Sequence, residues 1–141
     1  MAYPFKLTQP ITVDLEATAT FAANSPALTK VNCSILDPTE GISETKKIVP
    51  ASEKWIISAI YTKGAPTADA YVSIVINGIE QPFNLKLSET DITIQNPSRL
   101  PQIITLMPND SFVIVARNVS NIGASAVTQG FKVRIVRMPA K

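Results

Sequence analysis

The sequence predicts an all-β protein: one antiparallel β-sandwich domain over residues 1–141, jelly-roll-like, with about nine or ten short strands. In the stretch from Ile11 to Phe21 apolar side chains alternate with polar ones, the pattern of a strand with one buried face and one wet face. Six prolines between Pro26 and Pro97 recur every 12 to 16 residues, which favours short strands separated by turns and disfavours long helices.

The remaining strands are expected where apolar runs lie between turn-forming residues. Their expected ranges are 28–36, 45–49, 54–62, 70–77, 79–87, 91–95, 102–107, 111–117 and 130–138. The small-residue stretch 118–130 predicts a loop. Cys33 is the only cysteine, so no intrachain disulfide can form, and we expect a buried structural side chain.

The stretch 71–87 predicts a hairpin with a type I′ turn at Asn77-Gly78. The expected pairs are Ile76 with Ile79, Ile74 with Gln81 and Val72 with Phe83. This register puts Ile74, Ile76, Ile79, Phe83 and Leu85 on the core face and Tyr71, Ser73, Val75, Glu80, Asn84 and Lys86 on the opposite face. Because Pro82 cannot donate a hydrogen bond, the second strand is expected to be an edge strand or to be bulged.

Strands 54–62 and 111–117 are expected to be apolar on both faces, and therefore to be covered on both. On simple alternation Trp55, Ile57, Ala59 and Tyr61 share one face of the first strand, and Ile56 and Ile60 share the other. Charged residues make up only 17% of the chain, against roughly 25% in typical domains. A surface with so few charges repels other copies of the protein only weakly. We therefore expect a homo-oligomer, with a candidate interface of Trp55, Ile56, Ile60, Phe112 and Ile114.

The C-terminal segment carries a candidate basic surface of Lys132, Arg134 and Arg137. Lys132 and Arg134 are expected on one face of a strand, where they could contact phosphates or an acidic partner, or simply keep an outer face solvated. The net charge is only +2 and no clear aromatic stacking platform accompanies these cations, so we do not expect nucleic-acid binding.

The composition removes several kinds of chemistry. Histidine is absent and cysteine is single, which excludes Ser-His and Cys-His nucleophile systems and the usual zinc sites. The acidic pairs Asp14 with Glu16 and Glu89 with Asp91 are interpreted as solvated side chains. We expect no enzyme activity, no cofactor and no metal. No apolar run suggests membrane insertion or a secretory signal peptide.

A resemblance to known proteins rests on four segments: KKIVPASEKWIISAIYTKG, AYVSIVING, LMPNDSFVIVARN and FKVRIVR. Together they resemble the β-sandwich or jelly-roll subunits of virus and phage particles. The resemblance implies a structural role as a capsid, turret, decoration or fibre-head protein. It also implies other virion structural proteins as partners and a location in the virion after synthesis in the host cytoplasm.

The alternative is a ligand-binding β-sandwich module that recognises carbohydrate or a cell-surface partner. Trp55, Tyr61 and Tyr71 are the aromatic side chains that could stack on a sugar. Exposure of Trp55 and Tyr61 to solvent distinguishes this alternative from a purely structural role.

Overall fold

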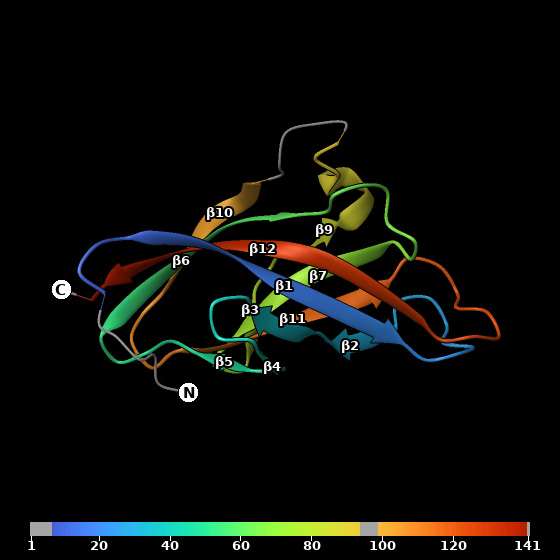
Figure 1. The fold of residues 1–141 in the computed structure, drawn as a ribbon. Coiled ribbons are helices and arrows are strands. Elements are labelled where there is room, and N and C mark those ends of the chain that lie inside the picture. The colour runs from blue at the N-terminus through green and yellow to red at the C-terminus, as the bar shows by residue number, and fades with distance from the viewer. Residues whose placement is uncertain (1–6, 94–98, 141) are drawn as a thin grey trace.

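The computed structural model describes the backbone of residues 7–93 and 99–140, and the side chains of 7–93 and 103–140. Two antiparallel sheets face each other as a sandwich (Figure 1), which confirms the predicted fold class. Sheet A contains, in spatial order, β10 (Arg99–Leu106), β6 (Glu53–Tyr61), β12 (Val127–Pro139), β1 (Ile11–Phe21), β3 (Ser34–Asp37) and β4 (Ile42–Glu44). Sheet B contains β2 (Lys30–Asn32), β11 (Ser111–Asn118), β7 (Ala70–Ile76) and β8 (Ile79–Glu80), with β5 (Lys47–Ile48) beside β11 and β9 (Leu85–Lys86) beside β7. A short 3₁₀ helix, η1 (Leu87–Thr90), follows β9.

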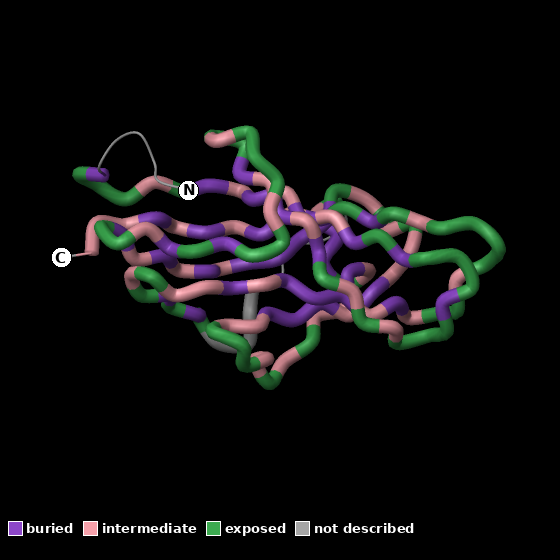
Figure 2. The backbone as a smooth tube through the Cα atoms, turned by 90° about the horizontal axis from the view of Figure 1, so that it is seen from below, coloured by how far each residue is buried: buried purple, intermediate pink, exposed green. Residues whose placement is uncertain are grey.

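The long strands β1 and β12 form the centre of sheet A. They pair along the whole of β1, from Ile11 opposite Arg137 to Phe21 opposite Val127. The predicted alternation of β1 is confirmed, because every second residue from Val13 to Phe21 is buried and the residues between them are not. Figure 2 shows the same alternation of buried and more exposed positions along the strands.

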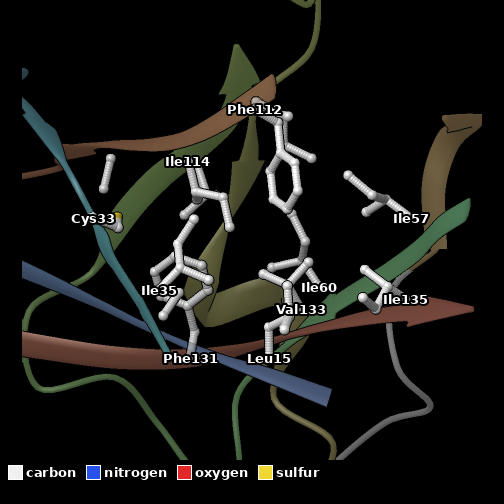
Figure 3. Close-up of a cluster of buried hydrophobic side chains, with 14 of the residues drawn as sticks. Leu15, Cys33, Ile35, Ile57, Ile60, Phe112, Ile114, Phe131, Val133 and Ile135 are labelled. Atoms are coloured by element: carbon white, nitrogen blue, oxygen red, sulfur yellow. The ribbon is translucent and has the colours of Figure 1, made fainter. Parts of the chain in front are cut away.

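The core lies between the two sheets (Figure 3). Phe112 and Ile114 point from β11 of sheet B towards side chains of sheet A such as Leu15 and Val133. Cys33 is fully buried beside them, as predicted. Burial raises the pKa of the Cys33 thiol to about 12, because a buried thiolate loses its hydration, so the thiol stays protonated and unreactive.

Several predicted strands are divided or shortened. The range 28–36 separates at Cys33 into β2 in sheet B and β3 in sheet A, because the chain crosses there between the sheets. Only Lys47–Ile48 of the range 45–49 forms a strand, and β4 was not predicted. In the range 91–95, Asp91 makes an isolated bridge, residues 92–93 form a turn, and residues 94–95 lie outside the described residues.

The predicted hairpin forms with the expected turn. Asn77 and Gly78 both have positive φ, 49° and 85°, as a type I′ turn requires. The predicted pairing of Ile76 with Ile79 is confirmed, and the Gln81 N–H donates to the Ile74 carbonyl. Beyond Pro82 the register shifts by two residues, because proline cannot donate to the ladder and this is the sheet edge.

Two details of the hairpin prediction were therefore wrong. Val72 pairs with Leu85 and not with Phe83. Ile79 is 69% exposed and not part of the core, because β8 is a two-residue edge strand beside the turn. The side chains of Phe83 and Leu85 are partly buried and do pack against the core, as expected.

A β-bulge in β6 changes which side chains face the core. Arg134 of β12 lies opposite Ala59, and Ile135 opposite Ile57, so Ser58 is an extra residue in the ladder. The alternation reverses at this point, and Ile60 faces the core with 0% exposure. The prediction that Ile60 opposes Trp55 and Ile57 across the strand was wrong, because simple alternation allows for no extra residue.

Candidate functional site

The predicted interface residues lie mostly inside the sandwich. Trp55, Ile60, Phe112 and Ile114 are each 0% exposed in the core. They are core residues, because the side chains of the opposite sheet bury them. Ile56 is half-buried on the outer face of sheet A, opposite Val136 of β12. A surface for partners must therefore be sought elsewhere.

Two of the three predicted basic residues lie on the outer face of sheet A, each beside a carboxylate of β1. The Lys132 Nζ is 3.2 Å from Glu16, and the Arg134 Nε donates to Asp14 over 2.9 Å. Tyr61 also donates to Asp14, over 2.6 Å. Burial would raise the pKa of Asp14, but the hydrogen bonds from Arg134 and Tyr61 outweigh it and hold the pKa below its ordinary value. Both Lys132 and Arg134 are paired with carboxylates, so these two residues do not form an unpaired basic patch.

Arg137, the third predicted basic residue, is buried and not on the surface. Its side chain is 1% exposed, and its Nε and Nη2 each donate over 2.8 Å to the equally buried carboxylate of Glu53. The indole N–H of Trp55 donates to the same carboxylate over 2.8 Å. The sequence did hold a signal, since Arg137 continues the core-facing alternation of Phe131 and Ile135 along β12.

Three carboxylates of the two acidic pairs have close partners, and Asp91 is buried, so its interpretation as a solvated side chain was wrong. Asp14 and Glu16 pair with the cations of β12. Asp91 accepts hydrogen bonds from Thr93 and from the Gly64 N–H, and these lower its pKa. Among residues 7–93 and 99–140, no three His, Cys, Asp or Glu side chains lie close enough to hold a metal ion. Within the same ranges no helix is long and apolar enough to cross a membrane.

A groove of about 670 Å³ lies on the outer face of sheet B. Tyr71 of β7 and an ion pair between Glu80 and Arg117 line it. The two guanidinium Nη atoms of Arg117 donate to the two oxygens of Glu80, over 2.8 and 3.1 Å. Ser73 also donates to Glu80, over 2.7 Å. The hydrogen bond from Arg117, followed by that from Ser73, lowers the pKa of Glu80 to about 2, so this carboxylate is ionised at neutral pH.

The remaining lining of the groove comes from three separate parts of the chain. Leu28, which is 58% exposed, precedes β2, and Asn84, Lys86 and Glu89 come from the segment around β9 and η1. The hairpin register predicted the shared face of Tyr71, Glu80, Asn84 and Lys86. No local pattern could bring Leu28 or Arg117 to this face, because strand order across the sheet decides it.

A second feature, here called the end cluster, consists of Ile48, Ile79 and Met107, which are 54%, 69% and 51% exposed. Ile48 and Ile79 lie at the end of sheet B where Asn77 connects the hairpin turn with the turn before β11, and Met107 begins that second turn. The ladder puts Ile48 on the outer-face side of the sheet, with Ser111, and Ile79 on the core-face side, with Ile76. The Asn77 amide donates to Asp110 over 3.0 Å and accepts from the Ser111 N–H over 2.9 Å. Ile48 pairs with Ser111, Ile79 flanks the turn, and the Met107 N–H donates to Asp110.

Comparison with known proteins identifies no family. No family model matches the sequence, and no curated protein matches it. Among solved structures, a family 35 carbohydrate-binding module from Clostridium thermocellum has a TM-score of 0.41 at 12% identity, covering 91% of this chain and 98% of that one.

Two further structures resemble the chain at a similar level. The sugar-binding C-terminal domain of EclA has a TM-score of 0.36 at 13% identity, covering 96% of this chain and 82% of that one. The insecticidal δ-endotoxin Cry8Ea1 of Bacillus thuringiensis has a TM-score of 0.38 at 14% identity, covering 88% of this chain and 20% of that one. These scores are low, so the fold assignment rests on the two sheets themselves.

Proposed function

We propose that the protein is a non-enzymatic structural subunit that associates with copies of itself and with other structural proteins, as the subunits of virus particles do. The observation that carries the proposal is the end cluster, where three large apolar side chains around one end of sheet B are each more than half exposed. Grouped exposed apolar side chains are typical of a protein–protein contact, whereas single ones are ordinary. The resemblance of four sequence segments to virion subunits agrees with this role.

The charge of the chain also supports self-association. Its net charge is +2, and Lys132 and Arg134 on sheet A are paired with carboxylates, so two copies repel each other little. Ile48 and Ile79 are about three strand spacings apart, roughly 14 Å. A patch of this width is smaller than the roughly 800 Å² per partner of a stable interface. Association of two copies should therefore be weak, and should strengthen when each subunit contacts several neighbours.

The test is the mass of the protein in solution as its concentration rises. Sedimentation velocity across the micromolar range should show reversible association, and negative-stain microscopy of concentrated protein should show assemblies. Replacing Ile79→Lys should weaken association by about tenfold or more, since a lysine charge would be buried at the contact. The matched control is Ile103→Lys, because Ile103 has the same 69% exposure but lies on β10 of sheet A.

A monodisperse monomer at every concentration would count against self-association. Equal loss of association in both variants would mean that the end cluster is not the contact. If the chain stays monomeric alone, cosedimentation with the native particle that contains it tests the remaining role, that of a decoration protein. Failure to cosediment would then end the structural proposal.

A further inference from the structure

We propose that the groove on the outer face of sheet B is a carbohydrate-binding site in which Tyr71 stacks on a sugar ring. The site includes no residue of the end cluster, although Glu80 follows Ile79 in β8, and it does not depend on self-association. Its volume of about 670 Å³ falls within the roughly 300–1,000 Å³ of small-molecule sites. It is large enough to contact more than one sugar unit.

Tyr71 supplies the stacking surface. It lies on the outer face of β7, with Arg117 of β11 opposite on one side and Lys86 of β9 opposite on the other. The side chain is only half-buried, and its hydroxyl hydrogen-bonds to no other residue in the part of the chain that the structure describes. A tyrosine ring with an apolar face and a polar tip can pack on the C–H face of a sugar and also bind a hydroxyl.

The wall beside Tyr71 presents both donors and acceptors of hydrogen bonds. The exposed amide of Asn84 offers both, Lys86 donates, and the exposed carboxylate of Glu89 accepts. A sugar presents hydroxyl groups that each donate and accept, so a mixed set of this kind suits it. Asn84 hydrogen-bonds to no other side chain or backbone group among the described residues, so its amide is available to a ligand.

Charge and apolar area argue against other ligand classes. Glu80 and Glu89 face the groove, and the charge of Arg117 is already balanced by Glu80, so a phosphate would meet little net positive potential. Apolar contacts come only from Leu28 and the ring of Tyr71 within the lining, which is too little for an amphipathic helix or an acyl chain. A neutral saccharide is the ligand class that best fits the balanced charge and small apolar area of the groove.

The first experiment is a glycan array probed with the intact protein. Multivalent display is needed, because an open groove with one stacking ring should bind a single saccharide weakly. Each glycan that binds is then titrated into isotope-labelled protein, with amide shifts followed by NMR. We expect the shifted amides to lie in β7, β9 and β11 around Tyr71.

Variants connect the binding to the stacking residue. Tyr71→Ala should weaken binding by about tenfold or more, which is what loss of one buried aromatic contact amounts to. Asn84→Ala changes an exposed amide and should weaken binding without affecting the fold. The matched control is Tyr61→Phe, because Tyr61 is buried on sheet A, and binding should be unchanged.

The outcomes separate this proposal from the structural one. Absence of binding to every arrayed glycan, shifts confined to residues outside the groove, or unchanged affinity in both Tyr71→Ala and Asn84→Ala would overturn it. Preference for phosphorylated or sulfated glycans alone would also overturn it, since the groove would then be an anion site. Ile79→Lys, which tests self-association, should leave glycan binding by the monomer intact.

Discussion

The buried ion pair between Arg137 and Glu53 gives a sharp test of the structure. Replacing Arg137→Met keeps the length of the side chain but removes both guanidinium hydrogen bonds to a carboxylate that is 1% exposed. Glu53 would keep the hydrogen bond from Trp55 but lose its counter-charge. Removing one partner of a buried pair costs about 3–5 kcal/mol, a large part of the roughly 5–15 kcal/mol that stabilises a typical domain.

The assay is urea unfolding followed by circular dichroism and by the fluorescence of Trp55, the only tryptophan. A double-mutant cycle with Glu53→Gln should show strong coupling, because the double variant has no buried charge left to desolvate. The stability lost in the double variant should therefore be clearly smaller than the sum of the losses in the two single variants. Lys132→Met is the control, since it removes a half-exposed pair with Glu16 and should cost at most about 1 kcal/mol. A loss below about 1 kcal/mol for Arg137→Met would refute the burial of this pair.

Two further predictions concern Glu80 and Ser58. The pKa of Glu80 is lowered from 4.5 to about 2 in the folded protein, so the stability it contributes is present above pH 4.5 and is lost as the pH falls towards 2. Acid titration of the free energy of unfolding should therefore be steeper for the natural protein than for Glu80→Gln, and equal slopes would contradict the pairing with Arg117. Deletion of Ser58 should remove the bulge while leaving Ala59 opposite Arg134 and Ile60 opposite Val133, so Ile60 should stay in the core. The loss of stability in urea unfolding should then stay below the roughly 2–5 kcal/mol that removal of a large core side chain costs. A loss of that size would contradict this register, and Ser58→Ala, which keeps the bulge, is the control.

Local patterns predicted the parts of the fold that depend on neighbouring residues. Alternation fixed both faces of β1, because no extra residue interrupts its ladder with β12. The dipeptide Asn77-Gly78 gave the hairpin turn, since few other sequences adopt two positive φ angles in succession. Pro82 correctly indicated an irregular edge strand. The size of the register shift depends on the residue at which β9 resumes pairing with β7.

The failures arose where strands far apart in the sequence decide the outcome. The bulge at Ser58 is visible only in the pairing of β6 with β12, so Ile60 was assigned to the wrong face. The prediction of Arg137 on the surface rests on its charge and is wrong, because its place in the alternation of β12 indicates the core. The groove itself was not predicted: the hairpin register gave only the shared face of Tyr71, Glu80, Asn84 and Lys86, while Leu28 and Arg117 reach it through strand order.

The pairing of β1 with β12 has a consequence for how the chain reaches its native state. Ile11 lies opposite Arg137, so the central ladder of sheet A joins segments more than a hundred residues apart. Contacts of such long range make folding slow, because the entropy of closing the loop is lost before the ladder is complete. During synthesis, β1 has no partner on one of its two edges until the last residues of β12 leave the ribosome. A chain that lacks β12 therefore leaves this edge of β1 unpaired, which favours aggregation.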